Sequence, residues 1–402
     1  MIYILLRIKS ILRNPDNLIY IAFISVFLHY IVTGLTIIGL GIFLLVNKNT
    51  RSMIFLHKGK GFFFAFIAYT LLIALYNKNF IGIACSLACF LIVIISYYVR
   101  TTVTEQTFER CLDICCIAAI PLTVAAIVDK ILCNAVPNHR IQLWFFNPNY
   151  FCAIMAAIVV ICAFKVTSHK NGVMLYYICA AFAAVSMYIG QSMFAFVEMF
   201  VGLCVLLILK RKHLMLAIFL MAVCFCLIMI YCIPDLMPRI FESNITTDRR
   251  IRIWNDAMAF IQENPLFGRG FLSYYQYAGE HPEIYQTTHA HNFALEPLIS
   301  FGIVGSVLLL LFLWSYYSKV TECKELLRVN CATTLILAIS AGVLAHMTTD
   351  MTALWIQTGF LYALILGGIG IDEKALNRRI IACTQKSDSI PEASPNTERT
   401  DI

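Results

Sequence analysis

The chain has 402 residues, of which 60% are hydrophobic and only 13% are charged. Soluble domains carry about 25% charged residues, so this composition excludes a soluble domain and indicates a helical protein that crosses a lipid bilayer several times. The formal net charge of +7 is concentrated in short connections between apolar runs. We therefore interpret it as a signal of membrane topology and expect no nucleic-acid partner.

Ten apolar runs predict membrane helices, at about 62–76, 79–99, 111–133, 150–166, 173–189, 192–209, 214–233, 293–317, 331–349 and 352–370. Residues 18–46 are also continuously apolar, with basic residues on both sides. A hairpin that turns near Thr33–Gly34 keeps both basic flanks on one side, whereas a single span separates them. We favour the hairpin, which gives an all-α, polytopic bundle of about twelve spans.

Basic residues alternate between the connections and set the expected orientation. The basic connections carry Arg100 and Arg110, Lys165 and Lys170, and Lys210–Arg211–Lys212. The positive-inside rule places them in the cytoplasm. The large loop 234–292 then lies outside. Residues 1–371 form the membrane domain, and the polar residues 372–402 are predicted to be a disordered cytoplasmic tail.

The outer loop is predicted to contain an amphipathic helix over 247–263, capped by Thr246 or Thr247 and ended by Pro265. Its predicted apolar stripe consists of Ile251, Trp254, Ala257, Met258 and Ile261.

Arg250 falls in the middle of that stripe, near the start of the helix. It either snorkels or forms an ion pair, or it contacts a phosphate group, which both a guanidinium and a helix N-terminus favour. Gly268 and Gly270 after Pro265 indicate a tight turn. A structural turn is favoured over phosphate binding, because an isolated Gly-x-Gly is weak evidence for it.

Three histidines, His281, His289 and His291, precede the next membrane run. In an extended segment His289 and His291 point to opposite sides, so only one of them is expected to face a site. We choose His291 as a candidate general base, because imidazole titrates near neutral pH. Asn292 or a nearby threonine is expected to cap the helix that follows. A zinc site made by His-x-His with Glu280 or Glu283 is an alternative, but its spacing fits no standard closed set.

Two further polar groups lie in apolar runs. Glu198 is expected to face the protein interior, protonated or paired, because a carboxylate in the bilayer is costly. His346 and Asp350 are four residues apart and are expected to share a helix face and orient one another.

These local motifs together resemble the O-antigen ligase/O-antigen polymerase superfamily of bacterial membrane proteins. The corresponding residues are Arg250, Trp254 and Ala257; Pro265, Leu266, Gly268 and Gly270; His291, Asn292, Leu295, Gly302 and Gly305; and Arg140 with Phe146–Asn149. The chain departs from the family pattern in two places. Met193 stands where an arginine often occurs, which makes Arg140 or Arg269 a candidate substitute, and Ser300 replaces a glutamate.

The resemblance implies a membrane-embedded glycosyltransferase of the GT-C type in the bacterial cytoplasmic membrane, inverting and without metal or cofactor. It would transfer a polyprenyl-diphosphate-linked glycan to an acceptor glycan outside that membrane, in contact with the bilayer and with other polysaccharide-assembly proteins. His291 would then activate the acceptor hydroxyl and Arg250 would bind the diphosphate. The supporting residues would be Arg140, Arg249 and Arg269 for the anion, and Asn292, Trp254, Tyr274 and Tyr275 for the sugars.

Several functions remain open from the sequence. A polymerase is the first choice, and an O-antigen ligase is the alternative within the superfamily. A polysaccharide flippase or exporter belongs to a different class, but we see neither the symmetric halves nor the charged central path that it predicts. A third interpretation is an inactive assembly protein, which the replacement of an arginine by Met193 supports.

Overall fold

The computed structural model describes residues 14–55, 60–133, 139–237, 243–327 and 331–388, and no β-strand occurs in these ranges. The α-helices are α2 (Pro15–Ser25), α3 (Tyr30–Val46), α4 (Lys48–Ile54), α5 (Lys60–Tyr76), α6 (Phe80–Thr102), α7 (Glu105–Leu132), α8 (Pro148–Ser168), α9 (Met174–Gly190), α10 (Met193–Leu209), α11 (His213–Cys232), α13 (Ser243–Glu263), α14 (Ser273–Glu280), α15 (Leu295–Leu327), α16 (Ala332–His346), α17 (Ile356–Gly367) and α18 (Ile369–Asp388). Two 3-10 helices, η1 (Pro234–Leu236) and η2 (Thr352–Leu354), complete the order.

Five of the described helices are long and apolar enough to cross a membrane: α6, α7, α8, α11 and α15. The bent pair α3 and α4, which meet at 98°, makes a sixth when it is counted as one span. The helices α5, α9, α10 and α16 are apolar but shorter. The prediction of an all-helical membrane bundle is therefore confirmed.

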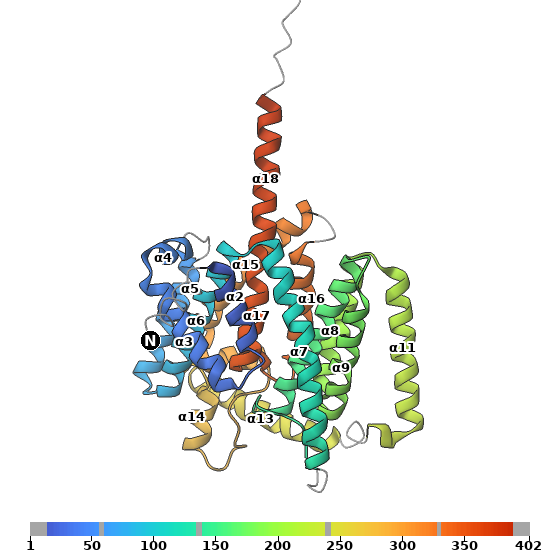
Figure 1. Cartoon of the computed structure of the whole chain (residues 1–402). Helices are drawn as coiled ribbons and strands as arrows, with labels where there is room; N and C mark the ends of the chain where they lie inside the picture. The colour runs from blue at the N-terminus through green and yellow to red at the C-terminus, as the bar shows by residue number, and fades with distance from the viewer. Residues whose placement is uncertain (1–13, 56–59, 134–138, 238–242, 328–330, 389–402) are drawn as a thin grey trace, which may run out of the picture.

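The bundle is organised around α8, which is buried along most of its length and packs against α9, α10 and α16. In contrast, none of the residues His213–Cys232 that form α11 is buried. It stands at the edge of the bundle in Figure 1. A helix that is apolar on every side and unburied within the protein is suited to contact lipid.

The apolar residues 18–46 form two helices, α2 and α3, as the hairpin prediction requires, but the predicted turn position is wrong. The chain breaks at residues 26–29, and Thr33–Gly34 lies inside α3. The break is stabilised from a distance, because Gln357 and Trp144 donate side-chain hydrogen bonds of 2.7–3.1 Å to the carbonyls of residues 26–28. Local sequence does not reveal these partners.

The predicted disordered tail from residue 372 is also wrong over 372–388, which belong to α18, while residues 389–402 lie outside the described ranges. In Figure 1 this helix projects beyond the rest of the bundle. Its first turn is held by tertiary contacts. The Asp372 carboxylate accepts hydrogen bonds from the backbone N–H groups of Ala332 and Thr333 at the start of α16. Next to it, Glu373 forms a salt bridge with Arg100.

The segment 243–294 forms a layer at one end of the bundle, made of α13, α14 and residues 281–294 (Figure 1). We call it the outer layer because of this position at the end of the bundle. It has a small apolar core of its own, made by Ile253, Ala257, Phe260, Tyr274, Tyr277, Ala278, Ala290 and Ile299. The predicted amphipathic helix is present, but it begins at Ser243, so Thr246 and Thr247 lie inside it rather than at its cap. It ends at Glu263, just before Pro265, as expected.

The glycine-containing turn anchors this layer to the membrane bundle. Gly268 and Gly270 have positive φ, and the Gly270 N–H donates to the Ser300 carbonyl at 2.6 Å. A Cβ at Gly268 would lie 2.6 Å from the Ser300 carbonyl carbon. The partner helix α15 is itself broken at Gly302, which has φ 61° and ψ −168°. The glycines therefore allow two backbones to pack closely, which agrees with the structural interpretation of this turn.

Candidate functional site

A buried carboxylate, Asp350, joins the outer layer to the bundle. It lies just after α16 and is only 1% exposed. One carboxylate oxygen accepts a hydrogen bond of 2.6 Å from the Asn149 amide, and the other lies 3.1 Å from His291 Nδ1. Burial alone would raise the pKa of Asp350, but the hydrogen bond with His291 and the electrostatic interactions with His291, His289 and His346 lower it below its ordinary value. Asp350 is therefore an anion at neutral pH.

His291 is held between this carboxylate and a hydroxyl. Its Nδ1 faces Asp350, and its Nε2 lies 3.0 Å from Thr287 Oγ1. With Nδ1 donating to the carboxylate, Nε2 is the acceptor, so the Thr287 hydroxyl donates to it. The ring is 23% exposed. This arrangement leaves a basic nitrogen at the accessible edge of a buried acid, which suits proton transfer from an incoming hydroxyl.

The prediction that His289 points away from His291 is wrong. Both rings lie near Asp350, and their centroids are 4.1 Å apart. The cause is local, because His291 has φ 51° and so breaks the two-residue alternation of an extended chain. The His289 Nδ1 accepts a hydrogen bond from the His291 N–H, and its Nε2 lies 3.3 Å from the Tyr150 hydroxyl. Burial lowers the pKa of His289 to about 3, helped by His291 and opposed by Asp350, so this ring stays neutral.

Arg140 connects the acidic centre to the start of α10. Its Nη2 donates to Asn149 Oδ1 at 3.0 Å and to the Gln191 carbonyl at 3.3 Å. Gln191 directly precedes Ser192, the N-cap of α10, whose side chain makes no capping hydrogen bond. Met193, the departure from the family pattern, is the next residue. A guanidinium therefore lies beside the backbone next to Met193, as expected if Arg140 substitutes for the missing arginine.

Arg250 approaches the same helix start from the outer layer. Its guanidinium carbon lies 5.0 Å from the ring centroid of Phe194, in the first turn of α10. The predicted apolar stripe was partly wrong, since Ile251 and Met258 are largely exposed. The buried positions are Ile253, Ala257 and Phe260, with Trp254 and Ile261 partly buried beside them. Arg250 precedes this stripe at helical spacing and is partly buried.

The other predicted site residues on the outer layer make no direct contact with Asp350 among the described interactions. Arg249 is exposed. Arg269 forms a 2.9 Å ion pair with Glu280 and lies 3.9 Å from the Tyr277 ring centroid, in contacts that do not involve Asp350. Asn292 caps α15 by accepting from the Ala294 and Leu295 N–H groups, as expected.

Among the aromatic candidates, Tyr274 is fully buried, Trp254 is partly buried and Tyr275 is exposed. Sequence reasoning missed a different aromatic group beside the site. Phe146 stacks on Trp355, which stacks on Tyr150, whose hydroxyl meets His289. Phe146 is 62% exposed. Its position next to Asn147–Asn149 in the first outer-loop motif was the available signal.

The ligands of the alternative zinc site are not brought together. Glu280 pairs with Arg269, and Glu283 pairs with His281. The acid that joins His289 and His291 is Asp350 instead. Both of its oxygens already have partners, Asn149 and His291.

The expected mutual orientation of His346 and Asp350 is replaced by a buried pair deeper in the bundle. His346 Nδ1 lies 2.7 Å from Glu198 Oε2, and the Tyr362 hydroxyl donates to Glu198 Oε1 at 3.1 Å. Glu198 is thus interior and paired, as predicted. Asp350 lies beyond the end of α16, so its side chain is free to turn toward the outer layer.

Fold and site together define a multi-pass helical membrane protein with arginine, histidine and aspartate side chains gathered between the bundle and one outer layer. A family model described as O-antigen ligase matches residues 177–310. The matched segment is about a third of the chain and includes the start of α10, Arg250 and His291. Over this segment the chain is similar to the O-antigen ligase family. Arg140 and Asp350 lie outside the match, and no curated protein matches the chain.

The depressed pKa of His289 predicts an acid-labile fold. An unfolded histidine has a pKa of about 6.5. Between that value and about 3, the unfolded state binds more protons, so stability falls as the pH falls. This linkage amounts to about 2 kcal/mol at pH 5 relative to neutral pH.

Thermal unfolding in detergent at pH 7 and pH 5 measures this loss. His289→Gln should reduce the difference between the two pH values. The matched control His281→Gln, in a more exposed histidine, should keep it. An equal acid-induced loss in wild type and His289→Gln would contradict the assignment.

Proposed function

We propose that this protein is a metal-independent, inverting glycosyltransferase that transfers a polyprenyl-diphosphate-linked glycan to an acceptor glycan at the outer face of the bacterial cytoplasmic membrane. The observation that carries the proposal is a continuous set of contacts. It runs from His291 through Asp350 and Asn149 to Arg140 and the start of α10. These contacts support a mechanism in which a base and an anion site lie close together.

The anion site would lie at the N-terminus of α10. The first N–H groups of a helix are unsatisfied and carry partial positive charge. Arg140 and Arg250 approach this end from the bundle and from the outer layer. Two guanidinium groups and a helix dipole form a suitable site for a diphosphate, whose negative charge increases as the glycosidic bond breaks. Arg140 would compensate for Met193.

The base would be His291. Its Nε2 accepts a hydrogen bond from the Thr287 hydroxyl, which occupies the place that an acceptor sugar hydroxyl would take. Asp350 fixes the ring tautomer and stabilises the imidazolium that forms. As the acceptor oxygen bonds to the anomeric carbon, the bond to the diphosphate oxygen breaks. The diphosphate keeps the electron pair, and His291 takes the proton. A single displacement inverts the configuration.

The surroundings support a lipid-linked donor and a sugar acceptor. The site lies where the outer layer meets apolar helices, so a polyprenyl chain can stay in the bilayer while its diphosphate reaches the arginines. The exposed face of Phe146 offers a surface for a sugar ring. We further propose about twelve membrane crossings in a GT-C-like arrangement, with loop 234–292 outside and basic connections in the cytoplasm.

The first prediction of this mechanism separates Arg250 from Arg252. Arg250→Lys should lower turnover with purified protein and lipid-linked donor by about 10²-fold, because a point ammonium cannot replace the planar guanidinium fork. Arg252 is exposed and donates to the Glu283 carbonyl on the outer surface. Arg252→Ala, the matched control, should therefore have a small effect. Equal losses at equal membrane abundance would remove the special role of Arg250.

The second prediction concerns the base. His291→Ala should lower turnover by about 10²–10⁴-fold while donor binding is kept. Thr287→Val should leave activity largely intact, because a direct displacement requires only that the threonine hydroxyl gives way to the acceptor.

The two variants distinguish the direct mechanism from its rivals. Complete loss in Thr287→Val, with a glycan found covalently attached to the wild-type chain, would indicate a double displacement. Full activity of His291→Ala would show that another group takes the proton.

Polymerase is the preferred activity, and ligase is the alternative. Deletion in the native bacterium should leave single lipid-linked repeat units exposed on the outer face, where an added glycosidase can cleave them. Long lipid-linked chains would indicate a ligase. Units protected on the cytoplasmic face would indicate a flippase and would contradict the proposal.

A further inference from the structure

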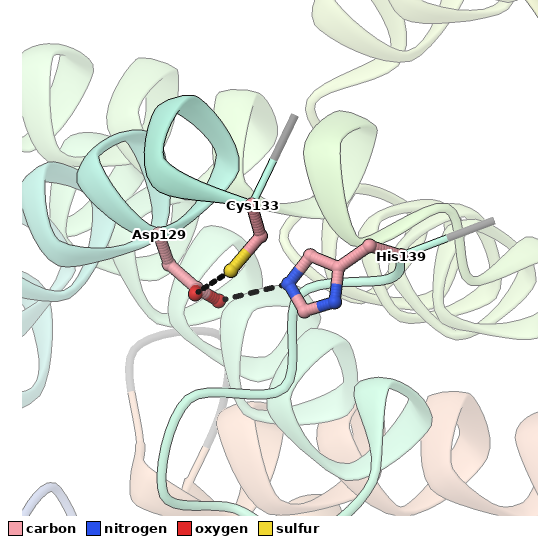
Figure 2. Close-up of side chains that lie close together, drawn as sticks. All are labelled: Asp129, Cys133 and His139. Atoms are coloured by element: carbon pink, nitrogen blue, oxygen red, sulfur yellow. Dashed lines mark hydrogen bonds and ion pairs between the residues drawn. The ribbon is translucent and has the colours of Figure 1, made fainter. Parts of the chain in front are cut away.

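A second group of chemically reactive side chains lies at the end of α7, separate from the site around Asp350. It consists of Asp129, Cys133 and His139 (Figure 2). Asp129 and Cys133 are four residues apart at the end of one helix, so they share a face. His139 belongs to the following segment, and its ring turns back toward the helix end, as Figure 2 shows.

The three potential ligand atoms are close enough for a single ion. His139 Nε2 lies 3.4 Å from Asp129 Oδ2, and Cys133 Sγ lies 3.5 Å from Asp129 Oδ1. All three ligand atoms lie within 4.8 Å of one another. Around a tetrahedral Zn²⁺, with bonds of about 2.0–2.3 Å, neighbouring ligand atoms are about 3.3–3.8 Å apart. The two separations from the Asp129 carboxylate lie within that range.

The ligand types select the class of metal. Thiolate and imidazole together favour Zn²⁺ and related first-row ions, whereas Ca²⁺ and Mg²⁺ prefer sets of oxygen atoms. All three side chains are partly exposed, so an ion from solution can reach them. Binding releases the Cys133 thiol proton to water. The two anionic ligands then balance the charge of the ion.

We propose that Asp129, Cys133 and His139 bind a zinc ion, with a fourth coordination position open to water. The ion would tie the segment after α7 to the end of that helix. Lys130 already contributes to this connection by donating to the His139 carbonyl at 3.4 Å. Arg140 directly follows His139, so the metal would fix the backbone that presents Arg140. The site shares no residue with the group around Asp350, and metal binding does not depend on the proposed transferase activity.

Zinc stoichiometry in the purified full-length protein tests this proposal directly. After dialysis against Zn²⁺, wild type should retain about one ion per chain, as a three-ligand site with one open position requires. Cys133→Ser and His139→Gln should each lose it. Cys232→Ser is the matched control, because Cys232 is also at a helix end but belongs to neither candidate ligand group. It should keep the ion.

Cobalt substitution identifies the sulfur ligand. The wild-type protein loaded with Co²⁺ should show thiolate-to-cobalt charge-transfer absorption, and Cys133→Ser should lack it. Zinc retention that is insensitive to Cys133 but lost in His291→Ala would assign the ion to His289, His291 and Asp350 and overturn this proposal. Absence of retained zinc in wild type would overturn it as well. Neither result bears on whether the protein transfers glycans, which the donor assay measures separately.

Discussion

The arrangement of the candidate functional site depends on how the buried negative charge of Asp350 is compensated. A carboxylate that is 1% exposed is costly unless hydrogen bonds and nearby donors replace its water. Here the replacements come from separate parts of the chain, Asn149 in the first turn of α8 and His291 in the outer layer. Satisfying one anion therefore fixes the outer layer against the membrane bundle. Without these partners, burial of a charged side chain in the short segment after α16 would be energetically unfavourable.

Other contacts also hold the outer layer in place. Its apolar core is small, and its attachment relies on close backbone packing at Gly268 and Gly302 and on polar contacts at its inner edge. Glu296 is one of these contacts. Its carboxylate accepts from the Ala290 N–H and from the Ser300 hydroxyl. A carboxylate one turn before Ser300 thus supports the segment that carries His289 and His291.

The sequence was informative where a pattern is local. Apolar runs predicted the helices, Pro265 predicted the end of α13, and Asn292 predicted the cap of α15. It failed where distant residues decide the outcome. The break at 26–29 depends on Gln357 and Trp144, and the helical start of α18 depends on contacts with α6 and α16. Intrinsic preference cannot reveal such partners.

The candidate site shows the same division. Spacing alone predicted that His289 and His291 face opposite ways, because it assumed an extended backbone. One residue with positive φ reverses that result. The partnership of Asp350 with Asn149 joins residues 201 positions apart, so no window of sequence contains it. Arg140 was recognisable from its motif, but its position beside the start of α10 required the fold.

The partners of Asp350 also bear on the chemistry that this centre supports. A metal ion at His289, His291 and Asp350 would replace hydrogen bonds that the two imidazole rings now make. The His289 Nδ1 accepts from the His291 backbone N–H, and the His291 Nδ1 contacts Asp350. By contrast, proton transfer at His291 Nε2 leaves every one of them in place and strengthens the bond to Asp350 as the imidazolium forms. In the proposed mechanism, His291 therefore moves a proton, and Arg140 and Arg250 supply the positive charge that faces the leaving group.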